Sequence, residues 1–181
     1  MKPKPKPKSA LRENLESILW AVTIAVVLRT FVIAPFKIPS GSMRPTLTEG
    51  DRILVTKILF RLRPPQRGEI VVFRSPENPK RPFIKRLIGL GGDHIEIRDG
   101  HVVVNGRVSD LPIVNQTYYY NQGAYGQEKQ IIDVPSGSYY VLGDNSASSQ
   151  DSRFWGFVAK RLMIGKALYI FWPPWRMRQL Q

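Results

Sequence analysis

The chain has 181 residues, of which 43% are hydrophobic, and its 27 Lys and Arg against 14 Asp and Glu give a formal net charge of +13. This length suits a single domain with its own hydrophobic core. Because the sequence contains no Cys, it excludes disulfides, thiol nucleophiles and Cys-based metal sites. The positive charge leaves three classes of partner open, which are nucleic acid, anionic lipid and an acidic protein surface.

The N-terminal third of the chain changes abruptly from basic to apolar. Lys and Pro alternate up to Lys8, so we expect residues 1–14 to form an extended, solvated tail. Residues 15–34 are apolar on all sides as far as Leu28, and roughly twenty helical residues at about 1.5 Å each would cross a membrane. Trp20 and Arg29 lie near the two ends, where aromatic and snorkelling side chains are typical. This pattern predicts a transmembrane helix over residues 15–34.

Two other interpretations of this apolar segment are a cleaved signal peptide and a buried core helix. Cleavage is disfavoured because Pro35 directly follows Ala34, the only plausible small-residue site. By the positive-inside rule, the basic residues before the segment place the N-terminus in the cytoplasm and residues 35–181 on the opposite side. We therefore expect a single-pass protein of the plasma (inner) membrane or of an internal membrane such as the thylakoid. The basic residues are Lys2, Lys4, Lys6, Lys8 and Arg12.

The remainder of the chain is predicted to be mainly β. Short β-branched runs bounded by Gly and Pro occur at 52–55, 69–73 and 82–88, and strands resume at 139–142 and 164–171. Between them, residues 94–108 contain three short runs separated by Asp-Gly and Asn-Gly, the strongest short signals for a hairpin, and so predict a meander. Residues 109–130 are rich in Tyr, Gln, Asn and Gly and are interpreted as an inserted loop or ribbon.

A bend rich in hydroxyls follows the apolar segment. Ser40 and Ser42 flank Gly41 between Pro39 and Pro45, so neither a regular helix nor a central strand can continue through them. Such a bend can turn one Ser outward and leave a backbone N–H pointing at the same spot, as a nucleophile and its oxyanion donor require. The alternative is an ordinary Ser/Gly/Pro turn.

A Ser nucleophile needs a base, and the two histidines are poor candidates. His94 and His101 flank a tight turn, and neither has an acidic residue at a sequence spacing that would indicate a catalytic pair. Two histidines are also too few for a His-rich metal site. No metal and no cofactor are therefore predicted. Lys remains, and it can act as a base only when it is neutral.

Lys85 lies in a strand that suits this role. Side chains alternate along a strand, so Phe83 and Leu87 share its face. Burial among them disfavours the ammonium form and can lower the pKa from about 10.4 to about 8. Arg86 cannot serve, because a guanidinium keeps its proton in proteins. The alternative for Lys85 is a strand-edge side chain that snorkels to water.

Residues 143–153 form a polar loop dense in hydroxyls. A neutral Lys base needs a hydroxyl or a carbonyl to aim its amine, and this loop supplies several. Asp151 and Arg153 can pair to hold the loop in place. A merely solvated loop is the default interpretation of such a composition.

Four segments that follow the apolar stretch together resemble the successive sequence boxes of bacterial type I signal peptidases. They are PSGSMRPTL at 39–47, GDRILV at 50–55, KRLIGLGGD at 85–93 and GDNSASSQDSR at 143–153. The order of the boxes and the preceding apolar segment match the family as well. The resemblance extends from about residue 15 to the end of the chain.

The resemblance implies a role for each matching residue. Ser42 is the implied nucleophile, and Lys85 is the implied general base that later protonates the leaving amine. The Ser40 hydroxyl and the Ser42 backbone N–H are the implied oxyanion hole. Ser149 would orient the Lys85 amine while two charged residues brace the loop by an ion pair, namely Asp151 and Arg153. Shallow apolar pockets for small substrate residues would be lined by Phe36, Ile38, Pro39, Phe83 and Ile84.

The resemblance also implies a substrate and a fold. The substrate is the signal peptide of an exported preprotein, cut after an Ala-x-Ala-like site. The fold is an antiparallel β catalytic domain of the kind shared with self-cleaving repressors, with an apolar surface near the active site that dips into the bilayer. Residues 171–175 are either part of that surface or a capped last strand.

Several points stay open at this stage. The loop at 146–150 lacks the charges that many family members carry, so the choice of Ser149 over Ser148 depends on counting back from Asp151. A membrane-tethered module that binds peptides without cutting them is one rival. A nucleic-acid binder is another, but the chain has no helix-turn-helix pattern. The oligomeric state is not predicted.

Overall fold

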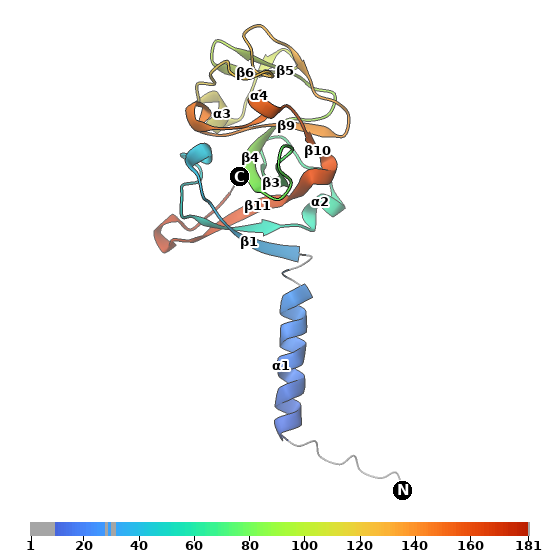
Figure 1. The fold of residues 1–181 in the computed structure, drawn as a ribbon. Coiled ribbons are helices and arrows are strands. Elements are labelled where there is room, and N and C mark those ends of the chain that lie inside the picture. The colour runs from blue at the N-terminus through green and yellow to red at the C-terminus, as the bar shows by residue number, and fades with distance from the viewer. Residues whose placement is uncertain (1–9, 28, 30–31, 181) are drawn as a thin grey trace.

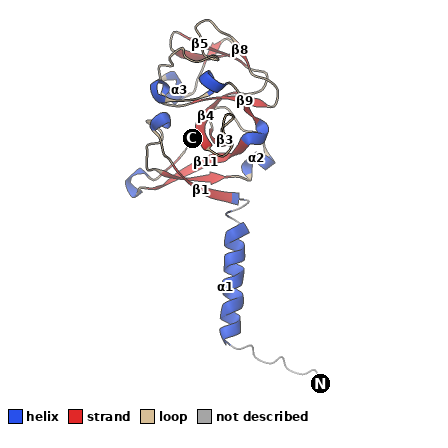
Figure 2. Cartoon of the chain, in the orientation of Figure 1, coloured by secondary structure: helices blue, strands red, loops and turns tan. Residues whose placement is uncertain are grey.

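The computed structural model describes residues 10–27, 29 and 32–180. Helix α1 (Ala10–Val27) stands apart from a body built mainly of β-strands (Figure 1). The remaining helices are short segments at the edges of that body (Figure 2). The prediction of a mainly β fold is therefore confirmed for the part of the chain after α1.

The larger sheet contains eight strands, and its order is β1-β2-β11-β3-β4-β9-β10 with β12 paired to β11. All of its pairings are antiparallel. The strands predicted at 52–55, 69–73, 82–88, 139–142 and 164–171 all appear here. The sheet consists of β1 (Ile33–Lys37), β2 (Arg52–Thr56), β3 (Ile70–Arg74), β4 (Pro82–Gly89), β9 (Ser138–Leu142), β10 (Val158–Ala159), β11 (Met163–Trp172) and β12 (Arg178–Gln179).

The smaller sheet confirms the predicted meander. Its order is β7-β6-β5-β8, from β5 (His94–Arg98), β6 (His101–Val104), β7 (Arg107–Val108) and β8 (Ile132–Asp133). Asp99 and Gly100 have φ of 51° and 77°, and Asn105 and Gly106 have φ of 51° and 79°. These left-handed conformations are the ones that tight hairpin turns require.

The segment at 109–130 packs against this smaller sheet. It contains α3 (Pro112–Asn115), and Tyr119 from it is fully buried in a hydrophobic cluster with β5 and β6 residues. Asn121 donates its side-chain amide to the carbonyl of Ile97 in β5, at 3.0 Å. The remaining short elements are η2 (Gly41–Met43), α2 (Leu59–Leu62), η3 (Ser146–Ser148), α4 (Ser152–Trp155), η4 (Lys160–Leu162) and η5 (Pro174–Arg176).

The N-terminal helix differs from its prediction. It begins at Ala10, inside the tail predicted over residues 1–14, and it ends at Val27. Ile33 and Ala34 lie instead in β1, where they pair with Thr56 and Val55 of β2. Ala34 itself is biased to an extended conformation because it precedes Pro35. Among the helices of the described residues, none is both long and apolar enough to cross a membrane. Residues 28, 30 and 31 of the predicted span, and 1–9 of the predicted tail, lie outside the described residues.

Candidate active site

The turn that carries Ser42 is anchored to the larger sheet by buried apolar side chains. Ser42 lies in η2, a single 3-10 turn between β1 and β2, and only 8% of it is exposed. Met43 and Leu47 follow it in the chain and are fully buried in a cluster with residues of β2, β3 and β11. Because two buried anchors follow the nucleophile candidate so closely, the bend has little freedom to move relative to the sheet.

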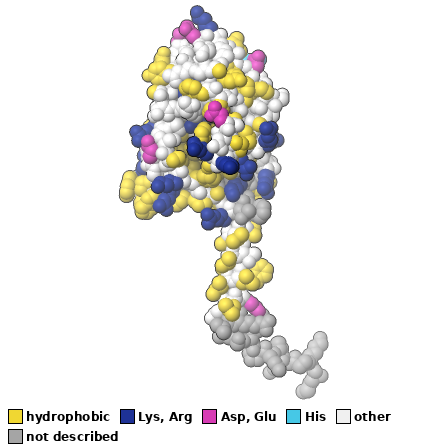
Figure 3. All heavy atoms as spheres, viewed as in Figure 1, with side chains coloured by type: hydrophobic (Ala, Val, Ile, Leu, Met, Phe, Trp, Pro, Cys, Tyr) yellow, Lys and Arg dark blue, Asp and Glu magenta, His cyan; other side chains and the backbone are white. Residues whose placement is uncertain are grey.

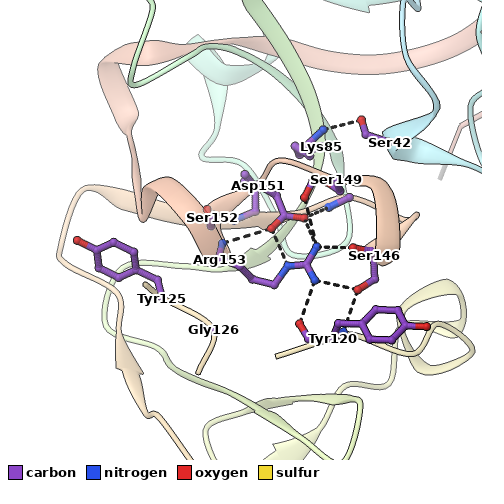
Figure 4. Close-up of polar contacts among 12 residues, drawn as sticks. Ser42, Lys85, Tyr120, Tyr125, Gly126, Ser146, Ser149, Asp151, Ser152 and Arg153 are labelled. Carbon is purple, nitrogen blue, oxygen red and sulfur yellow. Dashed lines mark hydrogen bonds and ion pairs between the residues drawn. The ribbon is translucent and has the colours of Figure 1, made fainter. Parts of the chain in front are cut away.

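Lys85 reaches this turn from inside the larger sheet. It lies on β4, which is paired on both sides by β3 and β9, and 4% of the residue is exposed. Its Nζ donates a hydrogen bond of 2.7 Å to Ser42 Oγ (Figure 4). The Phe83 ring shares this side of the strand, with its centroid 5.9 Å from Lys85 Nζ. The amine therefore points at a hydroxyl and does not snorkel to water.

The surroundings of Lys85 favour its neutral form. Burial lowers the pKa of the Lys85 amine to about 8, because the low-dielectric interior disfavours the ammonium ion. The carboxylates of Asp151 and Asp144 act in the opposite direction, and the Arg153 cation lowers the pKa further. A substantial fraction of Lys85 is therefore neutral at mildly alkaline pH.

Two hydrogen-bond donors gather beside Ser42 Oγ. Ser40 adopts an extended conformation before η2, and its hydroxyl does not cap the helix but lies 3.5 Å from Ser42 Oγ. The Ser42 backbone N–H belongs to the first turn of η2, so it has no partner within that helix. The Ser40 hydroxyl and the Ser42 backbone N–H therefore both belong to the turn that carries the Ser42 hydroxyl.

Asp151 and Arg153 form the ion pair expected from the sequence. Both side chains are fully buried, with 2.8 Å between Arg153 Nε and Asp151 Oδ1. Arg153 also donates to the backbone oxygens of Ser146 and Tyr120, at 2.8 and 3.0 Å. Asp151 accepts the Gly143 N–H at 3.1 Å. The pair thereby joins both ends of the loop after β9 to the 109–130 segment (Figure 4).

Ser149 lies near this centre without the hydrogen bond that was expected. Its Oγ is buried and makes no hydrogen bond to any described residue. Figure 4 draws it between the Ser42–Lys85 pair and the Asp151–Arg153 pair. The space around it is tight, because a Cβ added at Gly143 would lie 2.2 Å from Ser149 Oγ and 2.5 Å from the Ser42 carbonyl oxygen. Ser148, in contrast, is exposed and lines the cavity described below.

Asn145 contacts the nucleophile turn directly, and no role was predicted for it. Its backbone N–H donates to the Ser42 carbonyl at 3.1 Å, and its side-chain amide donates to the Gly41 carbonyl at 3.1 Å. The sequence feature that could have drawn attention to Asn145 is its position within the 143–153 segment, which resembles a family motif. What the sequence did not indicate was that this box and the Ser42 turn lie side by side.

Asp144 ties the same turn to the strand that carries Lys85. It accepts hydrogen bonds from Thr46 Oγ1 and from Arg86, whose Nη2 lies 2.8 Å from Asp144 Oδ2. The Asp144 side chain is fully buried and the Arg86 side chain is 5% exposed. Arg86, excluded as a base, therefore serves to anchor the loop.

A cavity of about 540 Å³ opens beside Ser42 and Lys85. Its walls are largely apolar and come from β1, β4 and the turn before η2, while Lys37 and Arg81 lie exposed at its edge. All five residues expected in the substrate pockets line it, namely Phe36, Ile38, Pro39, Phe83 and Ile84. A short extended peptide can therefore reach the Ser42 hydroxyl along an apolar wall.

The histidines take no part in this site. His94 does have an acidic partner, contrary to expectation, because the β5–β8 register places its Nδ1 2.5 Å from Asp133 Oδ1. This pair is exposed on the smaller sheet and does not line the cavity. Within the described residues, no three or more His, Cys, Asp and Glu are grouped so that they could hold a metal ion.

Sequence comparisons relate this chain to one protein family. A sequence model of the family described as "Signal peptidase, peptidase S26" matches residues 11–172. The chain is 40% identical over 183 residues to signal peptidase I of Leptolyngbya laminosa, covering 97% of this chain and 87% of the relative. It is 41% identical over 172 residues to a probable signal peptidase I-2 of Synechocystis sp., covering 92% of this chain and 76% of the relative. A crystal structure of a signal peptidase I from Enterococcus faecalis V583 aligns with 35% identity and a TM-score of 0.47, covering 56% of this chain and 95% of the other.

Proposed function

The chain belongs to the signal peptidase family, peptidase S26, and we propose that it is a serine peptidase that removes signal peptides with Ser42 as nucleophile and Lys85 as base. The observation that carries this proposal is the 2.7 Å contact between Lys85 Nζ and Ser42 Oγ, made where both residues are buried. A buried amine with a lowered pKa next to a hydroxyl is the arrangement that activates a Ser without His.

In the first step, neutral Lys85 accepts the Ser42 hydroxyl proton as Oγ attacks the scissile carbonyl carbon. The negative charge that develops on the carbonyl oxygen is stabilised by the Ser42 N–H and the Ser40 hydroxyl, a contribution of roughly 3 kcal/mol per donor in well-studied proteases. The Lys85 ammonium then gives its proton to the leaving amine, which breaks the C–N bond. The signal peptide remains attached to Ser42 as an ester.

In the second step, Lys85 is neutral again and acts on water. It accepts a proton from a water molecule that attacks the ester carbonyl, and it returns this proton to Ser42 Oγ as the ester bond breaks. The same two oxyanion donors serve both steps, because the carbonyl oxygen occupies the same place in each. We assign to Ser149 the role of orienting the Lys85 amine when substrate fills the cavity, since its buried hydroxyl makes no hydrogen bond to any of the described residues and is available for one.

The cavity supports the Ala-x-Ala part of the proposal. Its wall is formed by apolar side chains of β1 and β4, and only 2% of Ile38 is exposed. Small side chains on an extended peptide fit against such a wall at alternate positions, because successive side chains of a strand point to opposite faces.

The proposal includes a place at a membrane, with the N-terminus cytoplasmic and the catalytic domain on the opposite side. It is supported by the apolar side chains of α1 that the structure describes, which are largely exposed, and by the basic residues that precede the helix in the sequence. Exposed aromatics on and after β11 add a second apolar surface, with Trp172 49% and Trp175 83% exposed. An enzyme held at the membrane lies close to the cleavage sites of signal peptides whose helices end at the same membrane surface.

The test is cleavage of a purified preprotein by the full chain in detergent. Ser42→Ala and Lys85→Ala are run beside two matched controls, Ser136→Ala and Lys129→Gln, which replace exposed residues of the same types. We expect the wild type and both controls to cut after an Ala-x-Ala site, and both site variants to lose activity while staying folded.

Two results would contradict the proposal. Efficient cleavage by Lys85→Ala would show that another residue is the base. Tight signal-peptide binding by the wild type without cleavage would favour a binding module. A folding check by circular dichroism on each variant keeps these outcomes separate from simple loss of structure.

A further inference from the structure

The catalytic cavity has an apolar wall and a cationic edge. Lys37 and Arg81 line this edge and are exposed, and none of the described residues in the lining is acidic. Apart from these two residues, Lys85 is the only charged residue in the described lining. The chemistry of Ser42 and Lys85 uses neither Lys37 nor Arg81, so the edge carries positive charge that the reaction itself does not require.

Lys37 and Arg81 have no partner within the described part of the chain. Neither side chain makes a hydrogen bond or an ion pair with any described residue. The register of β1 with β2 also places Lys37 opposite Arg52, another exposed cation, and like charges directly across two strands repel each other. The charge of the edge is therefore not offset locally and can act on an anionic group of the substrate.

The surroundings of the edge have the same sign of charge. Strand β1, which ends at Lys37, lies on the side of the body nearest α1 (Figure 1). On the face drawn in Figure 3, Lys and Arg side chains gather in this half of the body and acidic side chains are fewer. A field of this sign attracts carboxylates and disfavours ammonium groups.

Strand alternation places the two cations on the opposite side from the apolar wall. In β1, Ile38 is 2% exposed and faces the core, whereas its neighbour Lys37 is exposed and points to the other face. The Ser75 N–H donates to the Arg81 carbonyl at 3.0 Å, which extends the pairing of β3 with β4 by one residue. Because Ile84 packs against the same core as Ile38, Arg81, three positions earlier, lies on the other face of β4.

The place of the two cations along a bound peptide follows from alternation and distance. In the proposed function, the first and third residues before the cut face the apolar wall, so the second and fourth point to the side of the cations. Arg81 precedes Lys85 by four positions, which is about 13 Å along an extended strand at roughly 3.3 Å per residue. The second residue therefore lies close to the reacting groups, and the fourth lies beside the cationic edge.

From these observations we propose that Lys37 and Arg81 form a subsite for an acidic side chain at the fourth residue before the cut. The subsite adds a charge preference to the requirement for small residues, and it discriminates among preproteins that all carry an Ala-x-Ala site. A carboxylate suits both cations, since Arg supplies a planar fork of donors and Lys a compact charge. The inference rests on the proposed function, because it requires the substrate to run along β1 and β4 toward Ser42.

The experiment compares kcat/KM of the full chain in neutral detergent for soluble Ala-x-Ala peptides that carry Glu, Gln or Lys at the fourth residue before the cut. A second set of peptides carries the same changes at the second residue. The charge of the edge is removed in Lys37→Gln/Arg81→Gln and reversed in Lys37→Glu/Arg81→Glu. A matched control, Arg74→Gln/Lys80→Gln, replaces two exposed cations near the start of β4 that do not line the cavity. Circular dichroism checks that each variant is folded.

We expect the wild type and the matched control to prefer Glu over Gln at the fourth residue by about fivefold. This ratio should fall to about one in the charge-removed variant, and the charge-reversed variant should prefer Lys. Raising the salt concentration from about 50 mM to about 500 mM should reduce the wild-type ratio, because exposed charges are screened. The inference is overturned by no preference in the wild type, by a preference that survives in the charge-removed variant, or by a preference confined to the second residue.

Peptide binding separates this inference from the proposed function. Ser42→Ala should bind the same peptides without cutting them, and fluorescence anisotropy gives its Kd for each peptide. Failure of the wild type to cut any peptide would refute the proposed function, and the ratio of Kd values would still decide the subsite. Binding of the Glu peptide about fivefold more tightly than the Gln peptide supports the subsite, and equal binding overturns it.

Discussion

The amine of Lys85 lies 2.7 Å from the hydroxyl of Ser42, although 43 positions separate the two residues in the chain. Both residues are buried, and Lys85 lies in the middle of β4, an inner strand between β3 and β9. The acid–base behaviour of the site therefore depends on a Lys that is paired with a hydroxyl and not with a carboxylate.

This arrangement predicts activity that rises with pH. With the pKa of Lys85 near 8, the neutral base is scarce at pH 6 and dominant at pH 9. We expect kcat/KM for a peptide substrate to increase across this range with a midpoint near pH 8. The measurement is a pH–rate profile in a single mixed buffer, and a maximum near pH 5 would refute Lys85 as the base.

The same burial makes folding stability depend on pH. The folded Lys85 has its pKa near 8 and the unfolded one near about 10.4, so between these values the unfolded state binds more protons and stability rises with pH. Lys85→Met removes the cost of burying the charge, and below pH 8 it should raise the unfolding free energy by about 3 kcal/mol. Denaturant titrations at pH 7 and pH 10 measure this, and Lys129→Gln serves as the exposed control. An equal gain at both pH values would contradict the prediction.

Asn145 is predicted to position the nucleophile turn. Asn145→Ala removes the amide bond to the Gly41 carbonyl while the backbone bond to Ser42 remains, so we expect kcat to fall about tenfold with little change in KM. Stability should fall by about 1 kcal/mol. Single-turnover cleavage measures the rate, and Asn78→Ala, which alters an exposed loop, is the control. A raised KM with unchanged kcat would show a role in substrate binding.

Ser149 and its neighbour Ser148 form a matched pair for testing which hydroxyl aims the Lys85 amine. Ser149 is buried and Ser148 is exposed, so only Ser149→Ala should lower kcat, by about tenfold or more. Ser149→Thr should restore part of the rate if the added methyl group fits. Equal effects of the two Ala substitutions, or a larger effect at Ser148, would reverse the assignment.

The Asp151–Arg153 pair is predicted to be needed for folding of the loop. Asp151→Asn leaves a fully buried Arg without its partner, which costs about 3 to 5 kcal/mol in comparable cases. Thermal unfolding of the full chain measures the loss. Glu49→Gln, which breaks the exposed pair with Arg44, should leave the transition nearly unchanged. A double variant, Asp151→Leu/Arg153→Met, should lose less than Asp151→Asn does, because no charge is left unpaired.

Local patterns in the sequence determined most of the strands and the candidate chemistry. The Asp-Gly and Asn-Gly pairs readily adopt the positive φ values that tight hairpin turns require, so the meander followed from residues close together in the chain. The same holds for the bend at Ser42, where two prolines prevent a longer helix or a central strand from continuing through it. Lys85 could be selected because strand alternation places Phe83 on its own face, and the structure shows this neighbour.

Only the tertiary structure decided how these pieces meet. Ile33 and Ala34 continue an apolar run, yet pairing with β2 places them in a strand, since hydrogen bonding to a distant segment outweighs local composition. The contacts of Asn145 with Gly41 and Ser42 bridge about a hundred positions, and no local pattern encodes such a distance. Burial likewise comes from packing, so the lowered pKa of Lys85 is a property of the folded sheet and not of the residues beside it in the chain.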